Sequence, residues 1–163
     1  MWQKKYIKAI KEGKQLIGDK VLRESAIEWL GDMQVLQEVR FKGFTADLLG
    51  INTKYKGVIG LEIKSDRDTL EKLESQLLGY SKYCHLVCVF TTLSRMSEIQ
   101  YMLADERFAH VGIYYYLMSD DGNCFKCKRE PEWNDIGEIG TKWIGKKHQL
   151  YQWKYLLEGI WGE

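Results

Sequence analysis

The strongest constraint on the fold of this chain is a pair of β-forming segments, residues 44–51 and 57–64, on either side of the polar residues 52–56. Both segments are rich in aliphatic and β-branched residues, and the segment between them is typical of a turn. The pattern therefore predicts a β-hairpin. If the turn is centred between Lys54 and Tyr55, Asp47 lies directly opposite Glu62.

This register places chemically useful side chains together. Directly opposed residues on one face of a sheet have Cβ atoms about 5 Å apart, so the carboxylates of Asp47 and Glu62 could share one divalent cation. Side chains alternate along a strand, so Lys64 projects from the same face as Glu62, and Ile63 points to the opposite face.

A second hairpin is predicted just upstream. Residues 37–41 and 44–47 flank the Lys42-Gly43 pair, which can form a tight two-residue turn. In this register Glu38 faces Asp47, and a three-stranded meander carries a row of three carboxylates, Glu38, Asp47 and Glu62.

Such oxygen ligands suit Mg²⁺ or Mn²⁺, which bind a few carboxylates together with water and phosphate oxygens. Asp47 and Glu62 are the expected metal ligands, and the backbone carbonyl of Ile63 could add a further one. A metal held there can polarise a phosphoryl oxygen and activate a water, and the ammonium of Lys64 can stabilise the charge of the transition state. The pattern favours phosphodiester hydrolysis, although acids and a lysine on neighbouring strands can also be a solvated surface with ion pairs.

At these positions the chain resembles the PD-(D/E)XK nuclease superfamily, with Asp47 and Glu62-Ile63-Lys64 as its motif. Gln76 and Tyr80 resemble the Q-x3-Y element of RecB-like nucleases, and the set is similar to small nucleases of phages and mobile elements. Ala46 stands where the family name has a proline. The family also has an acid on its first helix, for which Glu24 and Glu28, four residues apart on one face of a predicted helix, are candidates, and Glu38 on the first strand could serve instead. The resemblance spans residues 22–92 and implies an α/β, restriction-endonuclease-like core: a helix, a three-stranded antiparallel meander, a second helix and a further strand. It also implies that Gln76 joins the catalytic residues.

Further elements follow from local patterns. Residues 2–30 predict one or two helices, broken near Gly18, with Asp19 as the cap of the second. Ser65 and Asp68 resemble a capping box that begins a helix directly after Lys64. The other expected elements are a strand at 86–91, a helix at 94–107, a strand at 111–118, a turn at 120–123, a strand at 124–128, a loop at 130–141 and a helix at 142–160.

Length and composition predict one domain. With 163 residues and 45% hydrophobic content, the chain can form one core, which we expect in residues 19–92, with a hairpin and helix elaboration in residues 93–163. No apolar stretch reaches membrane-spanning length, and no signal peptide is recognised. We therefore expect no membrane partner and a cytoplasmic location, in a bacterium or a phage-infected host cell.

A net charge of +1 gives no global argument for a polyanionic partner, but the charge is unevenly distributed. Residues 1–23 carry seven Lys or Arg against two acids, and residues 139–157 carry four lysines, no acid and several aromatic residues. These segments could contact phosphates and bases, and the second could equally be a core helix with a solvated lysine face. Lys42, Lys54 and Tyr80 are further candidates for nucleic-acid contacts.

Two other chemistries fit the residue spacing less well. Cys84, Cys88, Cys124 and Cys127 could form a zinc site only if Cys84 and Cys88, four apart in a predicted strand and thus about 13 Å from each other, came together. The glycine-containing residues 140–147 lack the Ser or Thr that follows the lysine of a phosphate-binding loop, so we expect no nucleotide cofactor.

The sequence thus predicts a Mg²⁺- or Mn²⁺-dependent deoxyribonuclease, with an endonuclease as the leading interpretation. A homodimer would provide the two half-sites needed to cut both strands. A non-catalytic nucleic-acid or protein-binding module on the same fold is the alternative from another class. Exonuclease, nickase and ribonuclease activities stay open.

Overall fold

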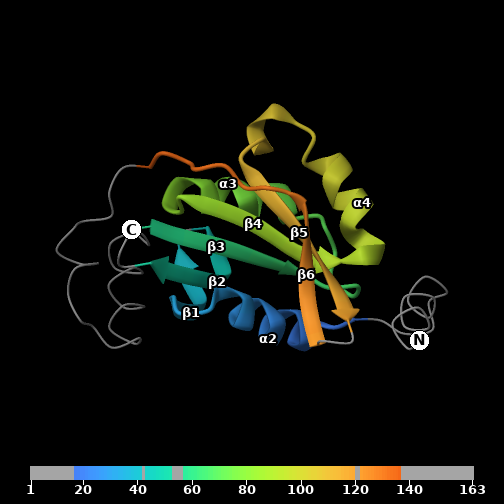
Figure 1. Ribbon diagram of the computed structural model, residues 1–163. Helices are drawn as coiled ribbons and strands as arrows, with labels where there is room; N and C mark the ends of the chain where they lie inside the picture. Colours follow the sequence, from blue (N-terminus) through green and yellow to red (C-terminus); the bar gives the residue numbers. More distant parts are fainter. Residues whose placement is uncertain (1–16, 42, 53–56, 120–121, 137–163) are drawn as a thin grey trace.

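The computed structural model describes residues 17–41, 43–52, 57–119 and 122–136. Their elements are shown in Figure 1. In chain order they are α2 (Asp19–Leu30), β1 (Gln34–Phe41), β2 (Phe44–Asn52), β3 (Gly57–Lys64), α3 (Leu73–Tyr83), β4 (Leu86–Thr92), α4 (Leu93–Met102), the short 3₁₀ helix η1 (Glu106–Phe108), β5 (Val111–Ser119) and β6 (Gly122–Arg129).

The strands form one six-stranded sheet in the order β1-β2-β3-β4-β5-β6. The first three strands are an antiparallel meander, β4 and β5 continue parallel to β3, and β6 returns antiparallel to β5. Parallel neighbours need a crossover connection, and α3 and α4 provide it. The expected mixed α/β sheet with a meander and further strands is confirmed.

Helices cover both faces of this sheet, with α2 on one side and α3 and α4 on the other (Figure 1). The α2 face buries Leu22, Ala26 and Leu30 against side chains of β2 to β5. The opposite face buries residues of α3 and α4, including Leu77 and Ile99, in a second cluster. All eight residues of β3 are buried, as expected for a strand that lies under helices on both faces.

Both predicted hairpin registers are confirmed. Leu48 pairs with Leu61 across β2 and β3, and Val39 pairs with Ala46 across β1 and β2. One residue departs from the ladder: Glu38 has a φ of +53°, a left-handed conformation that is uncommon outside glycine. The meander is therefore distorted next to Asp47, the position that Glu38 would otherwise face.

Helix starts were predicted less well. The helix expected directly after Lys64 begins only at Leu73. Asp68 Oδ2 accepts a hydrogen bond from Ser65 N–H at 2.8 Å, so the capping-box pattern closes a turn instead. At α2 the N-cap is Gly18, and Asp19 lies in the first helical turn without a capping hydrogen bond.

The helix expected at 94–107 ends at Met102 and is followed by η1, where Asp105 accepts a hydrogen bond from the Arg107 N–H at 2.9 Å. The predicted strands at 86–91, 111–118 and 124–128 are confirmed as β4, β5 and β6. Residues 130–136 form no helix or strand, as expected. The helices predicted within 2–16 and 142–160, and most of both basic segments, lie outside the described residues. No helix in the described part of the chain has the length and apolar character needed to cross a membrane.

Candidate functional site

Asp47 lies where β2 and β3 stop pairing. The ladder between them ends at Leu48 and Leu61, and in the next position Asp47 Oδ2 accepts a hydrogen bond from the Ile63 N–H at 2.8 Å. The carboxylate thus satisfies a backbone donor of β3. This contact fixes Asp47 against the strand that carries Glu62.

Glu62 is an acid in an almost fully buried position, with 1% of its surface exposed. Burial is the main reason why the pKa of Glu62 is raised well above its usual range, and the nearby negative charge of Asp47 raises it further. The charge of Lys64 and a hydrogen bond from Tyr80 act in the opposite direction. Asp47 and Glu62 therefore interact directly, as the hairpin register predicted.

Tyr80 of α3 is fully buried and joins the two strands. Its hydroxyl accepts a hydrogen bond from Asp47 N–H at 2.8 Å. As a donor it lies 3.1 Å from the Leu61 carbonyl and 3.4 Å from Glu62 Oε1. Burial and the two nearby acids raise the pKa of Tyr80 well above its usual range.

The close approach of Tyr80 depends on Gly60, because a Cβ atom at that position would overlap the tyrosine ring. The expectation that Tyr80 reaches back toward the acids is confirmed. Its proposed contact with nucleic acid is wrong, because a side chain with 0% exposure offers no surface for stacking. Tyr80 is a positioning residue.

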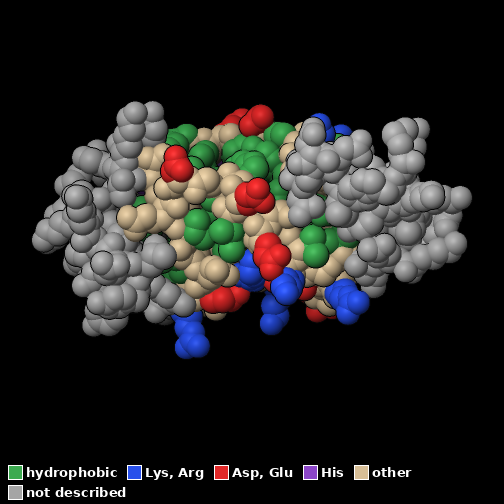
Figure 2. All heavy atoms as spheres, turned by 60° about the horizontal axis from the view of Figure 1, so that its bottom comes forward, with side chains coloured by type: hydrophobic (Ala, Val, Ile, Leu, Met, Phe, Trp, Pro, Cys, Tyr) green, Lys and Arg blue, Asp and Glu red, His purple; other side chains and the backbone are tan. Residues whose placement is uncertain are grey.

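Arg23 of α2 is the residue that the sequence analysis missed. Its side chain lies 2.9 Å from Asp19 Oδ2, 3.0 Å from Glu38 Oε1 and 3.5 Å from Asp47 Oδ1. It also donates to the Asp47 carbonyl at 3.1 Å. Figure 2, which turns the α2 side toward the viewer, shows basic and acidic side chains next to each other on this side. The Asp19 and Arg23 spacing was visible in the sequence, but such pairs are common on exposed helices.

The predicted row of three carboxylates is only partly present. Glu38 has 55% of its side chain exposed and pairs with Arg23, because the left-handed backbone at this residue takes it out of the ladder. Glu24 and Glu28 are exposed on α2. Within the described residues, no group of three or more His, Cys, Asp or Glu side chains is arranged to hold a metal ion.

One observation indicates that the remaining pair, Asp47 and Glu62, could bind a cation that prefers oxygen ligands. Four buried side-chain oxygens have no hydrogen-bond partner among the described residues, and two of them, Glu62 Oε2 and Gln76 Oε1, belong to residues predicted for the site. Gln76 lies one helical turn before Tyr80 on α3, and Tyr80 contacts Glu62. Buried oxygens without partners are costly, and hard divalent cations bind this type of ligand.

Lys64 is 8% exposed and lies near enough to Glu62 to lower the pKa of that carboxyl. Its backbone carbonyl accepts a hydrogen bond from Thr91 Oγ1 of β4 at 2.7 Å. The lysine thus lies close enough to act on Glu62 electrostatically, and its role beside the acids stays a prediction. The Ile63 carbonyl ligand stays a prediction, and Lys42 and Lys54 lie outside the described residues.

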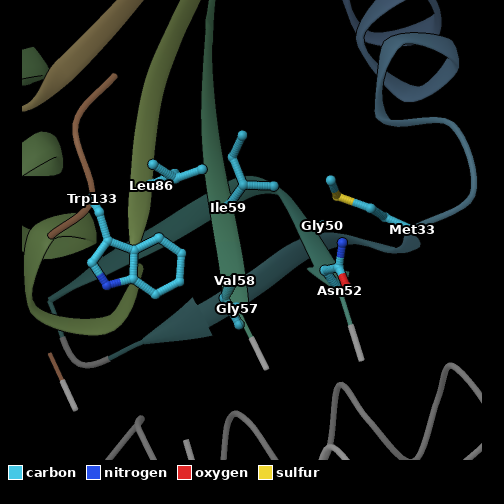
Figure 3. A pocket seen from close by; sticks show the side chains of 8 residues that line it. All are labelled: Met33, Gly50, Asn52, Gly57, Val58, Ile59, Leu86 and Trp133. Atoms are coloured by element: carbon cyan, nitrogen blue, oxygen red, sulfur yellow. The ribbon is translucent and has the colours of Figure 1, made fainter. Parts of the chain in front are cut away.

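A cavity lies away from these acids, near the start of β3 (Figure 3). Its lining is almost entirely apolar and consists of Met33, Gly50, Asn52, Gly57, Val58, Ile59, Leu86 and Trp133. Because it has few groups that could transfer a proton or bind a metal, the cavity is not the reaction site that the acids suggest.

Cys84, at the C-terminal end of α3, and Cys88 of β4 do not form a pair for zinc. Cys84 belongs to the core cluster on the α3 face, and Cys88 to the cluster on the α2 face. Burial raises the pKa of both thiols, which disfavours the thiolate form that binds zinc.

The fold and the site define a mixed α/β protein with a six-stranded sheet, helices on both faces and two neighbouring acids, one buried and one half-buried, near its centre. The chain belongs to the bacteriophage P4 protein cII family, whose model matches residues 8–141. This confirms the expected phage association.

Among solved structures, the SPO1766 protein of unknown function from Silicibacter pomeroyi is similar in fold. The TM-score is 0.51 at 16% sequence identity, over 77% of this chain and 78% of that one. A search of curated proteins gives no match.

Proposed function

We propose that this protein is a divalent-metal-dependent nuclease with a restriction-endonuclease-like core, and that it hydrolyses phosphodiester bonds in DNA. The order of α2, the β1-β2-β3 meander, α3 and β4 supports the proposal, because the PD-(D/E)XK resemblance implies the same order. Asp47 lies on β2, and Glu62 and Lys64 lie on β3, which is the arrangement that the resemblance implies.

The observation that carries the proposal is the carboxyl group of Glu62. It is buried, its Oε2 atom has no hydrogen-bond partner among the described residues, and the nearby Asp47 raises its pKa. Placing two acids together away from water is costly unless a cation or a proton compensates them. A divalent cation between Asp47 and Glu62 would relieve both the charge repulsion and the unsatisfied oxygen.

Each residue then has a role. Asp47 and Glu62 would hold the cation, with the Ile63 carbonyl as a further ligand, and Tyr80 keeps both acids in place. A bound Mg²⁺ or Mn²⁺ supplies Lewis acidity toward the phosphoryl oxygen and lowers the pKa of a water. Lys64 would stabilise the negative charge of the transition state, and Gln76, whose Oε1 atom has no hydrogen-bond partner among the described residues, would orient the attacking water.

The test is cleavage of plasmid, single-stranded and branched DNA in the presence of Mn²⁺ by the purified full chain. Glu62→Gln preserves the shape of the side chain and should abolish cleavage, as should Asp47→Ala. Glu106→Gln, an exposed acid of η1, is the matched control and should cleave normally. Wild-type protein without cleavage on any substrate, or a Glu62→Gln variant as active as wild type, would contradict the proposal.

A non-catalytic nucleic-acid or protein-binding module on this fold is the second candidate. It is favoured by Arg23, which pairs with Asp47 and Glu38 within the protein and so reduces their need for a cation. Calorimetric titration with Mn²⁺ separates the candidates: a nuclease site binds the ion and loses it in Glu62→Gln, whereas a binding module does not respond to either. The oligomeric state, for which the half-site argument predicts a dimer, can be measured by light scattering.

A further inference from the structure

Arg23 is surrounded by more negative charge than it can compensate. One guanidinium lies within 3.5 Å of the carboxylates of Asp19, Glu38 and Asp47, which leaves a formal excess of two negative charges before Glu62 is counted. These acids raise the pKa of Arg23, although its partial burial acts against them. The arginine therefore remains charged at all relevant pH values.

The contacts of Arg23 are unequal in length. Those to Asp19 and Glu38 are 2.9 and 3.0 Å, whereas the contact to Asp47 Oδ1 is 3.5 Å. Hydrogen bonds between a guanidinium and a carboxylate are strongest near 2.7–2.9 Å, so the contact to Asp47 is the weakest. Asp47 Oδ2 is held by the Ile63 N–H, which makes Oδ1 the atom whose partner can be exchanged most easily.

We propose that Arg23 is an internal competitor for the cation: its guanidinium occupies Asp47 Oδ1 in the free protein and must give up this contact when a divalent ion binds. The inference rests on the proposed function, because it takes Asp47 as a metal ligand. Asp19 and Glu38 retain the displaced arginine close by. Its positive charge then continues to oppose the bound cation, and the free protein binds metal more weakly than its acids alone would allow.

Removing this charge should therefore strengthen metal binding. A unit charge several ångströms from a divalent ion, under screening close to that of water, changes affinity by about tenfold. Arg23→Gln should bind Mn²⁺ about tenfold more tightly than wild type. A merely structural role would have the opposite sign, since a disordered site loses affinity.

The experiment is calorimetric titration of the full chain with Mn²⁺ alone. Arg23→Lys keeps the charge and should stay close to the wild-type affinity. Lys126→Gln removes an exposed charge from β6, four strand spacings or roughly 19 Å from β2, and should have no effect because screening acts over about 8–10 Å. Circular dichroism checks that each variant is folded.

Tighter binding in Arg23→Gln together with unchanged affinity in the two other variants supports the proposal. Equal or weaker binding in Arg23→Gln, or an equal gain in Arg23→Lys, overturns it while the proposed function stands. If neither wild type nor Arg23→Gln binds Mn²⁺, the metal-dependent function fails as well. Should Arg23→Gln not fold, NMR of the wild-type guanidinium decides: saturating Mg²⁺ must shift the Arg23 signals, and unmoved signals overturn the proposal.

Discussion

Replacing Tyr80 with phenylalanine tests the part of the site that does not depend on any metal. The substitution removes one oxygen from a fully buried side chain and leaves the ring in place beside Gly60. The lost hydroxyl accepts a hydrogen bond from Asp47 N–H and donates to the Leu61 carbonyl or Glu62 Oε1. No water can easily replace it in this closely packed position.

The expected loss follows from the groups left without a partner. Each buried polar group that loses its hydrogen bond costs about 1–3 kcal/mol. The backbone N–H of Asp47 is the group that should contribute most to this cost. We expect the free energy of unfolding to fall by about 2–3 kcal/mol. In a chain of this size that corresponds to a midpoint of thermal unfolding lower by about 5–10 °C.

Urea unfolding followed by tryptophan fluorescence measures the change, with Tyr101→Phe as the control. Tyr101 lies on α4 with 85% of its surface exposed, so the control should match wild type. A Tyr80→Phe protein within about 0.5 kcal/mol of wild type, below the cost of one unsatisfied buried group, would refute the description of Tyr80 as the connection between β2, β3 and α3.

Two further predictions concern charge. Glu62→Gln should stabilise the metal-free protein at pH 8. The folded-state pKa of Glu62 is raised, so the folded protein binds more protons than the unfolded chain. Wild-type stability therefore falls as pH rises from the ordinary carboxyl range through the raised pKa. The measurement is urea unfolding of both proteins at pH 8 and at about pH 4. The difference in free energy of unfolding between Glu62→Gln and wild type should be smaller at the lower pH, and an equal difference at both pH values would contradict the prediction. Arg129→Gln should lower the free energy of unfolding by about 2–4 kcal/mol, because Arg129 donates hydrogen bonds to the carbonyls of Leu103, Phe108 and Val111 at 2.7–2.8 Å. Lys128→Gln, at the exposed neighbouring residue, is the control. Equal stabilities of the two variants would argue against this prediction.

The meander was predictable because its causes are local. The positions of the turns near Lys42 and Lys54 and the alternation of apolar residues were enough to pair Val39 with Ala46 and Leu48 with Leu61. The apolar runs that became β4 and β5 were also recognisable. Asp47, Glu62 and Lys64 could be grouped for the same reason, since a correct register brings them together without knowledge of any other element.

Helix limits and residue roles required the tertiary structure. The capping-box pattern at Ser65 forms a turn, and α3 begins at Leu73, where its side chains meet the core cluster. The left-handed φ of Glu38 removed the third acid from the row. Nothing in the local sequence distinguished Tyr80 as a buried positioning residue from Tyr80 as a surface for stacking.

What the sequence determined by itself was thus the order of elements, the registers of two hairpins and the acid pair, because each depends on residues close together in the chain. The tertiary structure decided that Arg23 from α2 and Tyr80 from α3 approach Asp47 from different elements. Those contacts depend on how two helices dock on a sheet 24 and 33 residues away in sequence. Docking is set by the packing of both faces at once, which no local pattern records.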